Sequence, residues 1–174
     1  MGHKLYLLES LKLRKGDTFE FGSWKGKPIE WQVLTNRGGI LCISKYCLDE
    51  RRFDSKSNYW DYSELRQWLN LDFINKAFNS EENNFLQSYE GDKVTLLSIE
   101  EVERYFPSKS KRKGTFRDGS ASFWWLRSRF NVYSAADVGA DGDLNVDYVG
   151  CASGSVRPVI FLKKDVENYL EPEA

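Results

Sequence analysis

The chain has 174 residues, and its 25 basic and 26 acidic residues give a formal net charge of -1. This length suits one domain, and so balanced a charge argues against nucleic acid or an anionic membrane as the main partner. Aromatic residues make up 15% of the chain, which argues against a disordered protein. No apolar run reaches the roughly 18 residues that a membrane span needs. We expect one globular domain over residues 1–174.

Short strands are predicted for the first third of the chain. Residues 18–21 and 29–34 alternate between polar and apolar side chains, as half-buried strands do. Gly38 and Gly39 mark a hairpin turn into residues 40–43, a continuous apolar run that is typical of a central strand.

Helices are predicted for the middle of the chain. Asp61 and Glu64 have the spacing of a capping box. The apolar residues that follow them at helical spacing are Leu65, Trp68, Leu69 and Phe73. Residues 73–78 continue the pattern in a second short helix, and residues 94–97 have the composition of a strand.

A second capping box and a basic run follow. Ser98 and Glu101 predict a helix that extends to about Tyr105 and ends before Pro107. The basic run lacks interleaved aromatic residues, so we expect a flexible, solvated loop over residues 108–122 rather than a nucleic-acid site.

The chain closes with an apolar segment, residues 156–162, that predicts a strand with Pro158 at its edge or start. The predicted order of elements is strands, then helices, then short strands with long connections. This order indicates an α+β fold with an irregular sheet.

The three cysteines, Cys42, Cys47 and Cys151, cannot all pair with one another, and their spacing fits no common zinc site. We expect buried free thiols and no structural metal. The single histidine, His3, lies near the terminus, so no Ser-His-Asp arrangement is available and carboxylates would have to act as general bases. The sequence therefore argues against an enzyme, and it predicts no cofactor.

Several motifs together resemble a bacterial and phage domain family and span nearly the whole chain. The first group is Gly16-Asp17, Phe21-Gly22, Ile29-Glu30-Trp31 and Val33-Leu34, followed by Leu65-Arg66-Gln67-Trp68-Leu69-Asn70. The second group is Trp124-Trp125-Leu126-Arg127-Ser128, Ala135-Ala136, Val138, Asp141-Gly142 and Val156-Arg157-Pro158. Arg129 is a departure, because relatives usually carry Pro at that position.

The resemblance implies a C-type-lectin-like fold of the formylglycine-generating-enzyme type, with short twisted antiparallel sheets, two or three short helices and long irregular loops. Members of this group include the variable proteins of diversity-generating retroelements. In those proteins error-prone reverse transcription rewrites adenines of the C-terminal segment, which gives a diversified binding surface on a constant scaffold.

The composition of residues 129–155 tests this idea. Mutation of the adenines in an Asn codon never yields Lys, Glu, Gln, Met or Trp, and these types supply 38 of the 174 residues. None occurs among these 27 residues, where about six are expected by chance. A buried, glycine-rich region that excludes long side chains is the alternative explanation.

We predict a variable ligand-binding region over residues 124–158, which is rich in the Tyr, Ser, Asn, Asp and Gly of antibody paratopes. Predicted ligand contacts are Arg129, Phe130, Asn131, Tyr133, Ser134, Asp137, Asn145, Asp147, Tyr148 and Ser153. The aromatic members are the expected anchors. Predicted framework residues are Trp124, Trp125, Leu126, Ala135, Ala136, Val138, Leu144, Val156 and Ile160. Arg127 and Arg157 are expected to lock loops through hydrogen bonds.

Acidic residues add two further hypotheses. One Arg against four Asp between residues 129 and 155 would suit a ligand with a basic face. Asp141, Asp143, Asn145 and Asp147 would share one face of a strand, as in a calcium site. The spacing matches neither an EF-hand nor the lectin calcium motif, so turn formation at Asp141-Gly142 is the simpler interpretation.

The sequence thus predicts a receptor-recognition protein whose partner is a protein or glycan, for instance on a host cell surface. A structural or assembly domain of a virion is the alternative, and a formylglycine-generating-type enzyme is a weaker one. The first residues do not have the features of a signal peptide. We expect a virion-associated or cell-surface location for a retroelement variable protein, and a cytoplasmic one otherwise.

Overall fold

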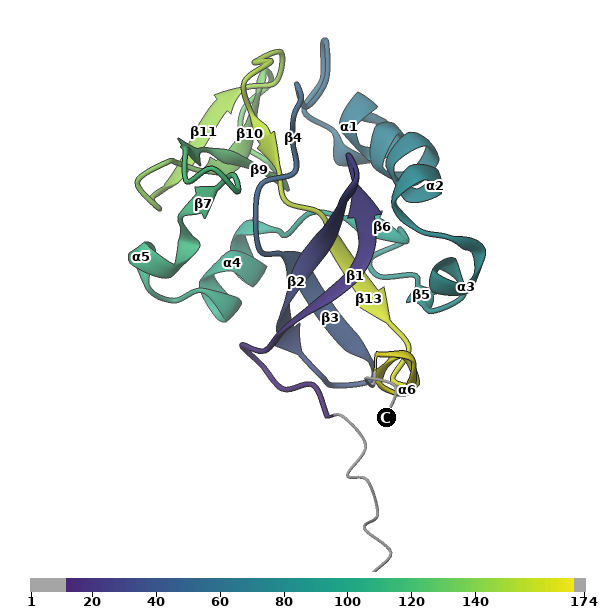
Figure 1. Ribbon diagram of the computed structural model, residues 1–174. Helices are drawn as coiled ribbons and strands as arrows, with labels where there is room; N and C mark the ends of the chain where they lie inside the picture. The colour runs from purple at the N-terminus through teal and green to yellow at the C-terminus, as the bar shows by residue number, and fades with distance from the viewer. Residues whose placement is uncertain (1–11, 171–174) are drawn as a thin grey trace, which may run out of the picture.

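The computed structural model describes residues 12–170, so the predictions about His3 and a signal peptide lie outside the described residues. Curled, mainly antiparallel sheets and short helices make up the described chain (Figure 1), which confirms the α+β class. Across this part of the chain every helix is too short or too polar to cross a bilayer.

The larger sheet joins both ends of the described chain. Its strands run in the order β1-β2-β3-β13-β5, and β6 also pairs with β13. Their bounds are β1 Thr18–Trp24, β2 Lys27–Thr35, β3 Ile40–Ser44, β5 Leu86–Gln87, β6 Val94–Thr95 and β13 Val159–Leu162. The three predicted N-terminal strands and the closing strand after Pro158 are confirmed. All of β3 is buried because β2 and β13 flank it on both sides.

The smaller sheet carries the C-terminal region and runs in the order β11-β10-β9-β12-β4. The bounds are β4 Asp49–Glu50, β9 Trp124–Arg129, β10 Ser134–Val138, β11 Leu144–Tyr148 and β12 Ser155–Val156. The β10–β11 connection turns at Asp141 and Gly142, as predicted, and Gly142 has a φ of 90°.

Two hydrophobic clusters form the core, one on each side of β9. Successive side chains of a strand point to opposite faces, so Trp124 enters one cluster and Trp125 the other. Both rings are fully buried and so is Leu126. The predicted framework residues are buried, apart from the half-buried Leu144.

The helices lie around the two sheets (Figure 1). Their bounds are η1 Trp60–Tyr62, α1 Glu64–Trp68, η2 Leu69–Phe73, α2 Ile74–Ala77, α3 Ser80–Asn83, α4 Ile99–Tyr105, α5 Lys109–Arg112 and α6 Val166–Tyr169. Ser98 and Glu101 make the predicted capping box of α4. The prediction for Asp61 is wrong: Ser63 caps α1, because Asp61 lies within the preceding 3-10 turn.

The predicted basic loop contains regular structure. Helix α5 lies within it, and β7 Gly114–Thr115 pairs with β8 Ala121–Ser122 in a two-stranded hairpin. The indole N–H of Trp124 donates to the carbonyl oxygen of Arg112 at 2.9 Å, which ties this segment to the core.

Candidate ligand-binding surface

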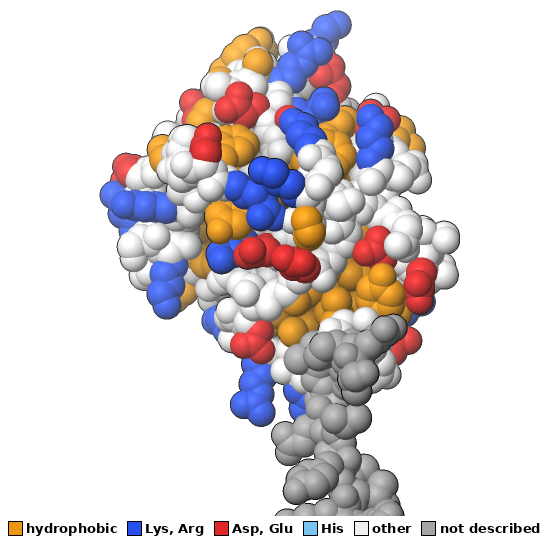
Figure 2. Space-filling model, in the orientation of Figure 1, with side chains coloured by type: hydrophobic (Ala, Val, Ile, Leu, Met, Phe, Trp, Pro, Cys, Tyr) orange, Lys and Arg blue, Asp and Glu red, His pale blue; other side chains and the backbone are white. Residues whose placement is uncertain are grey.

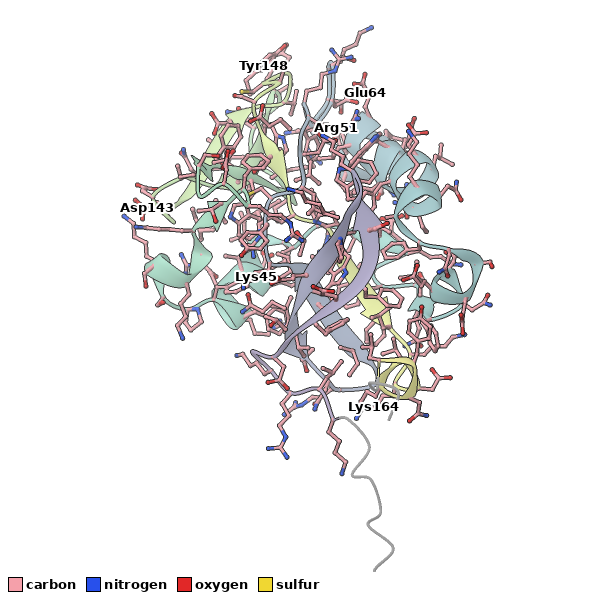
Figure 3. The ribbon with its side chains drawn as sticks, in the orientation of Figure 1. Lys45, Arg51, Glu64, Asp143, Tyr148 and Lys164 are labelled. Carbon is pink, nitrogen blue, oxygen red and sulfur yellow. The ribbon has the colours of Figure 1, made fainter. Side chains whose placement is uncertain are left out.

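An exposed apolar surface lies at the end of the molecule where β9, β10 and β11 meet the segment around η1. Its members are Tyr59, Tyr62, Phe130, Val132, Tyr133 and Tyr148, each of them at least 47% exposed. Elsewhere in residues 12–170, only Leu71 and Tyr169 are large apolar side chains with comparable exposure. Figure 3 shows Tyr148 at the upper tip, at the opposite end of the molecule from Lys164. Concentrations of exposed apolar side chains occur at interaction sites, so this surface is the candidate binding surface.

Two segments far apart in the sequence join to build this surface. The side-chain amide of Asn58 is buried and donates to the carbonyl oxygens of Asn131 and Ser134, the latter at 3.0 Å. The guanidinium of Arg129 lies 3.8 Å from the centre of the Tyr59 ring, close enough for a cation–π contact. The η1 segment therefore extends the surface of the β9–β10 loop.

The β10–β11 pairing places Tyr148 beside this loop. Ser134 is the register partner of Tyr148, and the backbone N–H of Val149 donates to the carbonyl oxygen of Tyr133 at 3.0 Å. The backbone at Tyr133 and Tyr148 is thus held by hydrogen bonds that do not depend on side-chain identity.

The framework beneath the surface is held by groups that lie outside the surface. The indole N–H of Trp125 donates to the carbonyl oxygen of Arg51 at 2.8 Å. Arg127 pairs with Glu101 and donates to the carbonyl oxygen of Leu96 at 2.5 Å. The surface can therefore change its side chains without removing these contacts.

Arg157 closes the other side of the framework. Its buried guanidinium donates to the carbonyl oxygens of Ser44 at 3.0 Å and Lys45 at 3.3 Å, and it lies 4.7 Å from the Trp124 ring. Burial lowers the pKa of Arg157 to about 10, so it stays charged at neutral pH. Arg127 and Arg157 both lock loops, as the sequence predicted.

Most predicted contact residues are accessible. The exposed ones are Arg129, Phe130, Asn131, Tyr133, Asn145, Tyr148 and Ser153, and the half-buried ones are Ser134 and Asp147. Sequence reasoning missed Tyr59, Tyr62 and Val132. The cluster Tyr59-Trp60-Asp61-Tyr62 was a signal in the sequence, but only the fold brings it to the C-terminal region.

Asp137 was a wrong choice as a ligand contact, because its side chain is fully buried. The residue lies in the middle of β10, with Trp125 and Asn145 as its partners on the two neighbouring strands. Neither carboxyl oxygen receives a hydrogen bond. Burial, reinforced by the nearby carboxylate of Asp147, raises the pKa of Asp137 to about 8. Protonated Asp137 can donate to Asp147, which satisfies the pair near neutral pH.

The acidic character expected for residues 129–155 is partly offset by a lysine from outside the segment. Lys109 of α5 pairs with Asp143 at 2.8 Å and with Asp141 at 3.8 Å (Asp143 is labelled in Figure 3). Asp141 and Asp143 lie in the turn rather than on β11, so they do not share a strand face with Asn145 and Asp147. The hypothesis of a ligand with a basic face loses its support. Among residues 12–170 no group of three acidic, Cys or His side chains could hold a metal ion.

Two of the three thiols are buried in surroundings that disfavour ionisation. Cys42, Cys47 and Cys151 are free, and the first two are buried, while Cys151 is half-buried. Burial raises the pKa of both Cys42 and Cys47, which disfavours the thiolate that nucleophilic catalysis requires. Cys47 lines a cavity of about 550 Å³ beside the β7–β8 hairpin and accepts a hydrogen bond from Ser155 at 3.1 Å.

The fold and this surface define an α+β protein that displays adjoining apolar loops on a buried two-sheet framework. Residues 37–164, most of the chain, match the model of the family described as Domain of unknown function (DUF6273). The chain therefore belongs to this family. The comparisons with curated proteins and with solved structures found no match.

Proposed function

We propose that the protein is a ligand-binding module that presents a diversified recognition surface on a C-type-lectin-like scaffold. The ligand would be a protein or glycan, and the origin a phage, virus or prokaryotic retroelement, as the sequence resemblance implies. The observation that carries the proposal is the exposed apolar surface, which gathers most of the large exposed apolar side chains at one end of the molecule. Tyr and Phe are the side chains that dominate binding hot spots and paratopes.

The missing residue types support diversification more than burial. If burial excluded long side chains from residues 129–155, the absent types would be missing only at covered positions. Many positions are exposed, including Asn131, Ala140, Asn145, Ala152 and Ser153, yet none carries Lys, Glu or Gln. Surface positions ordinarily favour such residues. Restricted codon access accounts for both the exposed and the buried positions.

The framework supports tolerance to change. Trp125 is held from outside the segment, by the Arg51 carbonyl, and the Val149–Tyr133 hydrogen bond joins backbone atoms. Exposed side chains such as Phe130 and Tyr133 can therefore vary without removing a core contact.

Comparison of clones from one population tests the proposal. We expect differences concentrated in residues 129–155, at exposed positions whose codons derive from Asn, with the buried framework constant. A template repeat and a reverse-transcriptase gene nearby would accompany them. An assembly domain, in which the same surface packs against a neighbouring subunit, predicts uniform sequences across the surface, and that result would overturn the proposal.

A further inference from the structure

A second cavity lies beside the turn between β2 and β3. Figure 1 shows this turn at the lower end of the molecule, away from β9, β10 and β11. The cavity has a volume of about 730 Å³. Its lining comes from five separate parts of the chain: the segment before β1, the β2–β3 hairpin, Tyr89 after β5, the end of α4, and β13. Lys and Arg side chains project from this lower end of the molecule (Figure 2).

The charged side chains that line the cavity are all basic. Lys15, Arg37 and Arg104 contribute to its wall, and no Asp or Glu does. Within residues 12–170 none of the three forms an ion pair. Three uncompensated positive charges around one opening favour an anionic ligand.

Hydrogen bonds hold the two backbone segments that carry Lys15 and Arg37. The hydroxyl of Thr35 accepts from the backbone N–H of Arg37 at 3.3 Å. The side-chain amide of Asn36 donates to the carbonyl oxygen of Leu13 at 3.1 Å, which ties the hairpin to the segment that carries Lys15.

Aromatic rings form the rest of the wall. Tyr89, Tyr105 and Phe161 are half-buried, and the centres of the Tyr89 and Phe161 rings are 5.8 Å apart. The Tyr89 hydroxyl donates to the buried carboxylate of Glu101, which holds the ring in place. The side chains of Leu34 and Leu41 lie beneath as an apolar floor. Rings and aliphatic groups offer a planar ligand an apolar contact, which a bare inorganic anion cannot use.

We propose that this cavity binds a planar ring compound that carries a phosphate group, the chemistry of a nucleotide. The guanidinium groups of Arg37 and Arg104 would pair with phosphate oxygens, since planar guanidinium donors match them well. The ring would lie against the aromatic wall. The site is independent of the exposed apolar surface, so either proposal can fail without the other.

Calorimetric titration of the full chain with ADP, adenosine and pyrophosphate tests the proposal. We expect ADP to bind at least about tenfold more tightly than adenosine, which lacks the charge, or pyrophosphate, which lacks the ring. The affinity for ADP should fall as salt concentration rises. No measurable binding of ADP, or equal binding of ADP and pyrophosphate, would overturn the proposal.

A matched pair of double variants identifies the site. Arg37→Glu with Arg104→Glu should weaken ADP binding by at least about tenfold. Lys111→Glu with Lys113→Glu changes the net charge equally at exposed positions outside the cavity and should leave binding unchanged. Circular dichroism and the unfolding temperature verify that both double variants fold. If Arg37→Glu with Arg104→Glu does not fold, Arg37→Gln with Arg104→Gln replaces it. If a single-stranded oligoribonucleotide binds far more tightly than ADP and the same variants abolish it, the cavity is part of a nucleic-acid site and the proposal is wrong.

Discussion

The surroundings of Asp137 raise the pKa of its carboxyl group and make the stability of the protein depend on pH. A strand buried on both faces leaves its carboxyl group without a donor, and Asp147 adds a like charge nearby. The folded protein therefore prefers the protonated form, while the unfolded chain ionises at the ordinary pKa of aspartate. Stability is highest below that ordinary value and is lost as the pH rises toward about 8, because over this range the unfolded chain ionises Asp137 freely while the folded protein keeps it protonated.

Asp137→Asn should remove this pH dependence, because an amide keeps the shape and can donate to Asp147. We expect the variant to be more stable than the wild type by at least about 1 kcal/mol above about pH 8, and nearly equal to it at about pH 4. Urea unfolding across this pH range measures the difference. Asp147→Asn is the control: it removes the neighbouring charge and should move the loss of stability to lower pH without abolishing it. An unchanged slope in Asp137→Asn would show that another group causes it.

Helix α4 depends on one carboxylate with several partners. Burial alone would raise the pKa of Glu101, but hydrogen bonds from the Tyr89 hydroxyl and the Ser98 N–H, together with the charge of Arg127, lower it overall. The helix cap and the β9 framework are thereby joined through a single side chain.

Glu101→Gln should destabilise the protein by about 3 kcal/mol, because it leaves Arg127 without its counter-charge in a largely buried place. Glu100→Gln, on the same helix but exposed, should change stability by less than about 0.5 kcal/mol. Chemical denaturation of both variants measures the contrast. Equal effects would mean that Glu101 acts only through helix propensity.

Gly154 limits what the segment of residues 129–155 can accommodate. A Cβ atom there would lie 2.1 Å from the indole nitrogen of Trp125, whose N–H bond to Arg51 prevents the ring from moving away. We expect Gly154→Ala to lower the free energy of unfolding by about 1–3 kcal/mol. Gly119→Ala is the control for backbone strain without a steric clash. Gly119 has a φ of 87°, but its added Cβ would meet no atom within 4 Å. A smaller loss in Gly154→Ala than in Gly119→Ala would contradict the steric argument.

At the scale of the whole molecule, we expect the exposed apolar surface to tolerate substitutions and the buried framework not to tolerate them. The double variant Phe130→Ser with Tyr133→Ser should change the free energy of unfolding by less than about 1 kcal/mol, since both side chains are more than 60% exposed. Leu126→Ala, in the same region but fully buried, should cost about 2–5 kcal/mol. Thermal and urea unfolding compare the two. A large loss of unfolding free energy in the double serine variant would contradict this, because it would show that these side chains contribute to the core.

Local sequence patterns determined much of this protein. The strands near residues 18–21, 29–34 and 40–43, the cap at Ser98 and the strand after Pro158 all follow from side-chain alternation, turn residues and capping, which act between near neighbours. The framework role of Arg127 and Arg157 was also predictable, because a guanidinium within an apolar motif needs acceptors close by.

Only the tertiary structure decided which distant segments meet. Three features depend on how the strands and sheets pair. They are the contact between Tyr59 and Arg129, the burial of Asp137, and the cavity lined by Lys15, Arg37 and Arg104. Alternation distinguishes the two faces of a strand only when one face is exposed, and β10 is covered on both, so its one acidic residue looked accessible in the sequence. Long-range pairing is a property of the folded chain, and no local pattern encodes it.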